Sequence, residues 1–128
     1  MTSAQPVRHA EAYRCGRLFA AVAALQRLAQ NEHHALGQPG AAEKAAARPE
    51  PVLREPLREV VQYLVQARIR GQGAAADPVF RSLTDFLPPA RAVPTSLHPD
   101  ERPDFHRGRE EQAALIAGTG PGEHPPRG

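Results

Sequence analysis

The sequence predicts an all-α fold, a helical bundle of about four helices in which two long helices run antiparallel. Apolar residues repeat at three- and four-residue steps along most of the chain, and the alternation of apolar and polar residues typical of strands is missing. Gly and Pro gather between these periodic stretches, where they separate helices. With 128 residues, the chain has room for one small domain.

The first long helix is expected to run from about Glu11 to about Leu36, ending before Gly37. Residues 1–10 show no periodicity and are expected to form a loose leader. Residues spaced three and four apart share one face of a helix, and this face is predicted to line the core. It consists of Cys15, Leu18, Val22, Leu25 and Ala29.

The second long helix is expected from about Pro51 to Arg70, after an Ala-rich linker at 37–50 that lies inside the domain. Pro51 falls in the first turn, where a missing N–H costs nothing. Pro56 either bends these first turns or marks where the regular helix begins. The apolar residues again follow a helical spacing: Leu53, Leu57, Val60, Leu64 and Ala67. The two apolar faces are expected to pack antiparallel across the linker.

Two shorter helices are expected in the remainder of the chain. Asp77 and Pro78 read as an N-cap followed by a first-turn proline, which would open a short helix. A last helix is expected to begin near Pro99. The single bundle domain is therefore predicted to cover residues 11–117, and residues 118–128 have the composition of a disordered tail.

Composition narrows the class of protein. Aromatic residues make up 5% of the chain and Trp is absent, which predicts a thin, aliphatic core. Such a core favours a subunit that shares buried surface with a partner, and a small independent bundle is the alternative. Cys15, the single cysteine, is interpreted as a small core residue in a reducing cytoplasm. No charge-free run reaches the roughly 18 residues that a membrane span needs, so a soluble cytoplasmic protein is expected.

The common catalytic and cofactor-binding motifs are missing, including the nucleophile elbow, the phosphate-binding loop and zinc-ligand spacings. Adjacent carboxylates, as at 110–111, diverge by about 100° on a helix and fit a solvated face better than an acid/base couple. The histidines at 33–34 do not share a helical face, and His98 with His106 falls short of a structural metal site. We therefore expect no enzyme activity and neither cofactor nor metal.

Positive charge is carried by fifteen arginines and a single lysine, Lys44. The planar guanidinium matches phosphate oxygens, although a GC-rich codon bias also explains the ratio. Seven arginines on the two long helices are candidate nucleic-acid-binding residues: Arg14, Arg17, Arg27, Arg54, Arg58, Arg68 and Arg70. Antiparallel helices would bring the first two of these close to the last two. The resulting basic patch suits sequence-independent contact with a nucleic-acid backbone, and salt bridging between subunits is the alternative.

Several stretches, taken in order, carry a resemblance to a known family. Residues 12–20 read AYRCGRLFA and residues 51–57 read PVLREPL. Further on, DFLP at 85–88 and PTSL at 94–97 precede the final segment, Phe105-His106-Arg107-Gly108 with Gln112. In order and spacing these stretches resemble the C-terminal region of the type I-C CRISPR large subunit.

The resemblance rests on four family features. They are an Ala-Tyr-x-x-Gly-Arg-Leu segment, a proline-led start of a long helix, a Phe-Pro turn with a Ser-Leu helix start, and a closing Phe-x-x-Gly-x-x-x-Gln helix. Two departures stand out, because the family's Asn-Ala-Thr-Ile segment is not visible and Arg109-Glu110 replaces an aromatic pair. The resemblance makes Gly16 a close-packing point, and the subtype stays open.

The resemblance implies a specific function. In such systems this region is also made separately, by internal translation, as the small subunit of the Cascade surveillance complex, and a chain that starts with Met1 shortly before the Tyr-x-x-Gly-Arg segment is similar to that product. Such subunits are helical bundles that contact the crRNA-bearing backbone and hold the displaced non-target DNA strand without catalysis. The expected partners are the Cascade backbone and large subunits, the crRNA-containing complex and target DNA, with more than one copy per complex. A helical adaptor that binds only protein is the alternative.

Overall fold

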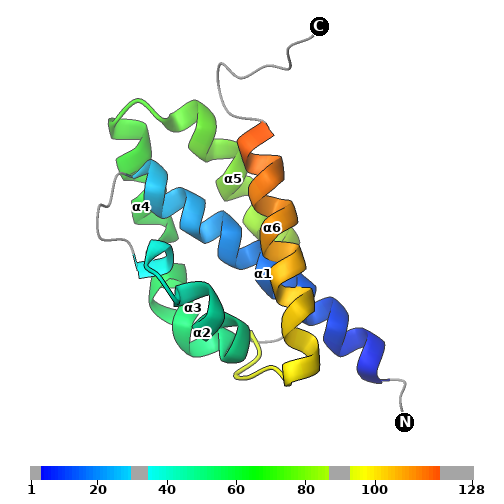
Figure 1. Cartoon of the computed structure of the whole chain (residues 1–128). Coiled ribbons are helices and arrows are strands. Elements are labelled where there is room, and N and C mark those ends of the chain that lie inside the picture. Colours follow the sequence, from blue (N-terminus) through cyan, green and yellow to red (C-terminus); the bar gives the residue numbers. More distant parts are fainter. Residues whose placement is uncertain (1–3, 30–34, 87–92, 119–128) are drawn as a thin grey trace, which may run out of the picture.

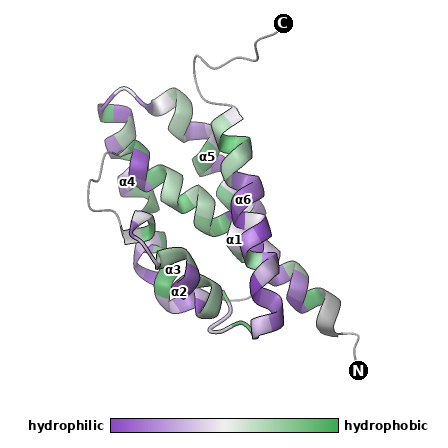
Figure 2. Cartoon of the chain, in the orientation of Figure 1, coloured by the Kyte–Doolittle hydropathy of each residue, from purple (hydrophilic) through white to green (hydrophobic). Residues whose placement is uncertain are grey.

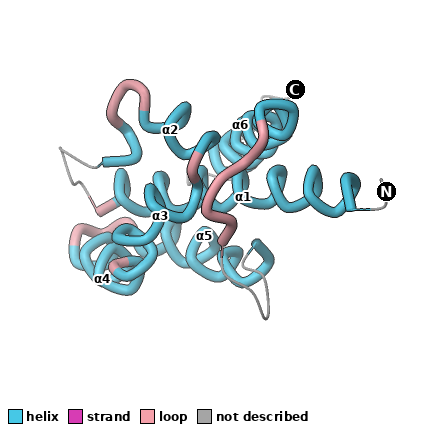
Figure 3. Tube along the Cα trace, turned by 90° about the horizontal axis from the view of Figure 1, so that it is seen from below, coloured by secondary structure: helices cyan, strands magenta, loops and turns pink. Residues whose placement is uncertain are grey.

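The structure of the chain, a computed structural model, describes residues 4–29, 35–86 and 93–118. Every regular element in these ranges is helical, so the all-α prediction is confirmed (Figures 1 and 3). The α-helices are α1 (Ala4–Leu28), α2 (Ala41–Ala47), α3 (Pro49–Arg58), α4 (Val60–Ile69), α5 (Gly73–Phe86) and α6 (Arg102–Gly118). Short 3-10 turns cover Ala35–Gly37 (η1) and Pro99–Glu101 (η2). The described residues thus form six α-helices, and the expected count of about four is wrong.

The expected loose leader is a helix from Ala4 onward, so α1 begins well before Glu11. The extra turns are held by the other end of the chain, because Arg8 Nε lies 2.7 Å from the Glu101 carboxylate. The Glu101 side chain is buried, and a buried carboxylate requires such a partner. Contacts distant in sequence therefore extend the helix beyond its periodic part.

Near the C-terminal end of α1, the buried side-chain amide of Gln26 connects the helix to its neighbours. Gln26, which is 2% exposed, donates to the Tyr63 hydroxyl at 2.9 Å and accepts from the Leu36 backbone N–H at 3.2 Å. α1 ends at Leu28, and the expected continuation toward Leu36 falls largely on residues 30–34, which lie outside the described residues. Gln26 thereby joins α1 to α4 and to η1.

The single helix expected at 51–70 is two helices, α3 and α4, which meet at Glu59. Pro56 has no N–H to donate to the carbonyl of Val52, which weakens the α-helical ladder at this point. The Glu59 N–H bonds instead to the Pro56 carbonyl at 3.0 Å, in a tighter turn that ends α3. The break lets α3 and α4 point their apolar faces independently at the core, so the prediction of two long antiparallel helices is not met.

α1 lies between α6 and α5, as Figure 3 shows, and α6 is its main neighbour. The two helices run in the same direction, because His9 contacts Asp104 and Arg17 contacts Gln112, both at a sequence separation of 95. α5 runs the opposite way and brings Phe86, at its end, onto Arg17. The antiparallel partner of α1 is therefore α5 rather than the expected second helix.

α1 and α6 cross where each carries a glycine. A Cβ atom at Gly16 would collide with the carbonyl oxygen of Phe105, and one at Gly108 would collide with the carbonyl oxygen of Tyr13. The helix backbones therefore touch, which only residues without side chains allow. Next to the crossing, the rings of Phe19 and Phe105 meet edge to face with their centroids 5.8 Å apart. This crossing, at Gly16 and Gly108, is hereafter the glycine crossing.

α4 and α5 form a hairpin that turns at Gly71, whose φ of 80° lies in the left-handed region that favours glycine. α5 begins at Gly73, so the helix start expected at Asp77 and Pro78 is wrong. Asp77 does not cap the helix but binds Arg68 at 3.0 Å across the hairpin. Asp77, which was expected at the start of the helix, instead forms an ion pair that links α5 to α4.

The core follows the apolar face predicted for the first helix. Its five predicted members are at most 5% exposed: Cys15, Leu18, Val22, Leu25 and Ala29. Figure 2 shows that the part of α1 inside the bundle is mostly hydrophobic. Phe105 and Leu53, both fully buried, complete the centre. Among the described helices, none is long and apolar enough to cross a membrane.

Candidate nucleic-acid interface

The seven candidate arginines occupy three kinds of surroundings. Carboxylates bind Arg54, Arg58 and Arg68, while Arg17 is held by α5 and α6. Within the described ranges, no ion pair forms to Arg14, Arg27 or Arg70, and all three are exposed. These three arginines are hereafter the unpaired arginines.

Arg54 makes the best-formed of the three ion pairs. Its guanidinium grips Glu50 with two nitrogens, Nη2 at 2.7 Å from Oε1 and Nε at 2.9 Å from Oε2. This bidentate bond lowers the pKa of the Glu50 carboxyl. Arg58 Nη1 is as far as 4.0 Å from Glu55 Oε1, and both side chains are more than 70% exposed. This second ion pair is therefore weak. Because Glu50 already binds the Arg54 guanidinium, a phosphate would have to compete with this carboxylate.

The basic patch expected from Arg14, Arg17, Arg68 and Arg70 does not form. Arg68 binds Asp77 near the start of α5, whereas Arg17 lies over the ring of Phe86 at its end. The rise of a helix, about 1.5 Å per residue, places these two points about 13 Å apart. The expected patch required α1 and α4 to be antiparallel, and α5 takes that place instead.

Arg17 is a tie between three helices. Its Nε donates to Gln112 Oε1 at 2.9 Å, and its guanidinium lies 4.7 Å from the centre of the Phe86 ring. Gln112 is 5% exposed, so the loss of Arg17 would leave a buried amide oxygen without this donor. Packing and hydrogen bonding account for Arg17 without a ligand.

Sequence reasoning missed a basic residue that comes from α6. The ring of Tyr13 lies between Arg17, at 5.8 Å, and Arg107, at 4.6 Å, and both distances suit cation–π contacts. The Tyr13 hydroxyl donates to Glu111 at 2.5 Å, which raises the pKa of the phenol. Asp104 binds Arg107 at 2.8 Å. The two carboxylates offset the two guanidinium charges, so this cluster is a poor phosphate site.

A signal for this cluster was present in the sequence. Tyr13 lies three residues before Gly16, and Arg107 directly precedes Gly108. If Gly16 and Gly108 are the two sides of one helix crossing, Tyr13 and Arg107 must lie close to one another. The sequence shows where each glycine lies but not that the two meet at one helix crossing.

The unpaired arginines line three different pockets. Arg14 lines a pocket of about 450 Å³ with Asp85 and Phe86, at the end of α5. Arg27 lines a smaller pocket of about 160 Å³ between α1 and α6, whose walls are largely alanine. Arg70 follows the end of α4. They offer separate points of positive charge rather than one binding pocket.

Two titrating groups have clear surroundings. Burial raises the pKa of the Cys15 thiol to about 12, which keeps it protonated and unreactive. The Asp104 carboxylate raises the pKa of His9 above 6.5. In the part of the chain that the structure describes, no three His, Cys, Asp or Glu side chains gather as metal ligands.

Comparisons with family models, curated proteins and solved structures found no match to this chain.

Proposed function

We propose that the chain is a non-catalytic small subunit of a type I CRISPR surveillance (Cascade) complex, which stabilises the R-loop by contacts to the displaced non-target DNA strand. The proposal begins from the sequence resemblance across residues 12–116. Its strongest structural support is the glycine crossing, because that crossing joins the first and last segments that carry the resemblance.

The two segments are interlocked at three points. Gly16 of the first segment faces Phe105 of the last, Gly108 of the last faces Tyr13 of the first, and Arg17 bonds to Gln112. A Tyr-x-x-Gly-Arg segment and a Phe-x-x-Gly-x-x-x-Gln segment are weak signals when taken singly. Their fit to one another supports interpreting them as two halves of one structural unit.

The unpaired arginines supply the proposed DNA contacts. An exposed guanidinium that is not bound to a carboxylate can approach a phosphate without first breaking an ion pair. Separate points of charge suit an extended single strand held by its backbone, and they read no base sequence. The small number of aromatic residues argues against a platform on which bases stack.

Co-purification tests the proposal. A tagged copy of the chain, expressed with the genes that surround its own, is expected to bring down a repeated backbone subunit and a crRNA. One protein partner without nucleic acid would contradict the proposal and support the adaptor alternative. The gene neighbourhood gives an independent check, because the proposal expects this reading frame to lie in frame at the 3′ end of a longer one.

A further inference from the structure

A small apolar pocket lies between α1 and α6, beyond the glycine crossing. The two helices touch at that crossing and diverge from it toward their C-terminal ends (Figure 1). Alanines from both helices form most of the walls, and their short side chains leave a space of about 160 Å³. Phe19 on α1 and Ile116 on α6 complete the apolar part of the wall. This space is hereafter the alanine pocket.

Two arginines line the alanine pocket, one from each helix. Arg27, on α1, is exposed and forms no ion pair within the described ranges. The side chain of Arg109, on α6, is 29% exposed, and its Nε is buried without a hydrogen-bond partner among the described residues. Arg109 Nη2 lies 3.2 Å from His106 Nδ1 and 3.7 Å from Glu110 Oε2. The Glu110 side chain is 71% exposed and its contact is long, so it offsets little of the positive charge.

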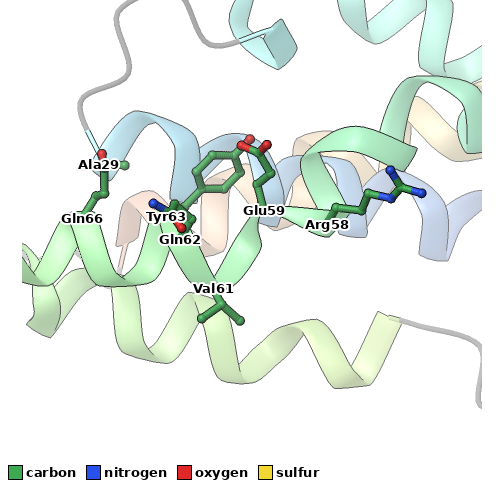
Figure 4. Close-up of a pocket in the computed structure, with 7 residues that line it drawn as sticks. All are labelled: Ala29, Arg58, Glu59, Val61, Gln62, Tyr63 and Gln66. Atoms are coloured by element: carbon green, nitrogen blue, oxygen red, sulfur yellow. The ribbon is translucent and has the colours of Figure 1, made fainter.

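A larger pocket beside α4, of about 640 Å³, has a different character (Figure 4). Arg58 and Glu59 place opposite charges in its wall, so that pocket favours neither an anion nor a cation. Gln62 and Gln66 add polar groups, and Val61 points away from them. The alanine pocket, in contrast, combines an apolar wall with charge of one sign.

We propose that the alanine pocket binds a short-chain carboxylic acid, with the hydrocarbon chain inside the pocket and the carboxylate at Arg27 and Arg109. A carboxylate presents two oxygens to the planar guanidinium, which binds both of them. The apolar wall disfavours an ion without a hydrocarbon part, because that ion would lose hydration there and gain no apolar contact. This inference goes beyond the proposed function and does not rest on it, although DNA would compete with the acid for Arg27.

The volume of the alanine pocket sets the length of the hydrocarbon chain. An apolar cavity of about 150 Å³ holds one benzene molecule, with its six carbons. The pocket of about 160 Å³ therefore suits a chain of about six carbons, as in hexanoate. It is too small for a drug-sized ligand, whose pockets measure roughly 300–1,000 Å³. For so small a ligand we expect a dissociation constant on the order of 1 mM.

NMR titration of the full chain with sodium hexanoate tests the proposal. The amide signals of Ala23, Ala24 and Ala113 should shift and saturate. From butyrate to hexanoate, each added CH₂ should tighten binding about two- to fourfold, whereas octanoate should gain little more because the pocket is full. No saturable shift up to about 50 mM hexanoate, or equal affinity across the series of acids, would overturn the proposal.

Hexanol and inorganic phosphate separate the two parts of the recognition. Each should bind at least about tenfold more weakly than hexanoate, because the alcohol lacks the charge and phosphate lacks the chain. If either binds as tightly as hexanoate, the proposal is overturned. Shifts of the same signals when the chain alone is diluted would mean that a second copy covers the pocket, and would also overturn it.

Two pairs of variants locate the bound acid. Ala113→Leu fills the pocket and should weaken hexanoate binding about tenfold or more. Ala114→Leu is the matched control, because both alanines are exposed on α6 and Ala114 lines a different pocket. Arg109→Gln should weaken binding about tenfold, whereas Arg81→Gln, at an exposed arginine of α5, should leave it unchanged. Wild-type affinity in the Ala113→Leu or the Arg109→Gln variant would contradict the assignment of this pocket.

Discussion

α1 and α4 differ in how much of their apolar surface is buried. α1 is enclosed, with α6 crossing it at the two glycines and α5 on its other side. α4 buries one face and leaves Val61, Val65 and Ile69 in solvent. The close packing around α1 stabilises the fold, whereas the exposed apolar residues of α4 contribute little to it. The α1–α6 pair is therefore interpreted as the scaffold of the fold, and the exposed face of α4 as a surface on which the fold does not depend.

The sharpest contrast between the two regions is the cost of truncating one apolar side chain in each. Phe105→Ala is expected to lower the free energy of unfolding by about 3–5 kcal/mol, because Phe105 is fully buried at the centre. Ile69→Ala removes a side chain that is 78% exposed, so its effect should stay within about 0.5 kcal/mol. Urea unfolding of the monomer measures both changes. Equal costs at the two positions would remove the distinction between scaffold and surface.

The glycine crossing gives the next largest effect. Gly16→Ala should improve helix propensity but force α1 and α6 apart, for a net loss of about 2 kcal/mol. Gly118→Ala is the control, because a Cβ there meets no atom within 4 Å. Thermal and urea unfolding report the difference. A Gly16→Ala variant as stable as Gly118→Ala would show that the two backbones do not touch.

The bond between Arg17 and Gln112 should contribute about 1 kcal/mol. A double-mutant cycle with Arg17→Ala and Gln112→Ala is expected to give a coupling energy of that size. Arg14→Ala, an exposed arginine on the same helix, should not couple to Gln112. If the effects of Arg17→Ala and Gln112→Ala are additive, the two side chains do not interact and the bond is contradicted.

The smallest expected effect is a pH dependence at the start of α1. The hydrogen bond to Asp104 raises the pKa of His9 above 6.5 in the folded state, so the pair stabilises the fold fully below about pH 6.5. That contribution disappears as the pH rises through the folded-state pKa of His9. His9→Gln should therefore differ from wild type more at pH 6 than at about pH 8, in unfolding experiments at both values. A difference that grows with pH would contradict the contact.

The sequence identified the core face of α1 but not the neighbours of that face. The period of 3.6 residues placed Cys15 to Ala29 correctly, because the core side of a single helix depends on local spacing. The start at Ala4 and the parallel course of α6 depend on contacts between residues about 95 apart, as between Arg17 and Gln112. Spacing within one helix carries no information about such contacts.

The candidate site was predictable in part, for the same reason. Periodicity indicated which arginines reach the surface, as it did for Arg14 and Arg27. It did not reveal that Arg54 and Arg68 meet carboxylates, or that Arg107 lies beside Tyr13. The expected patch did not form because α5 packs antiparallel to α1, with Arg17 at its end and Arg68 near its start.

The proposed contacts between the unpaired arginines and DNA are tested most directly by the salt dependence of DNA binding by the assembled complex. The triple variant of Arg14, Arg27 and Arg70 to alanine is compared with a triple variant of Arg54, Arg58 and Arg68, which removes the same charge from arginines that have carboxylate partners. Removing one arginine from a phosphate of a single strand should lower the slope of log K against log salt by about 0.7. The first variant should therefore lower the slope by about 2 while the second stays near wild type, and equal slopes in the two variants would contradict the claim.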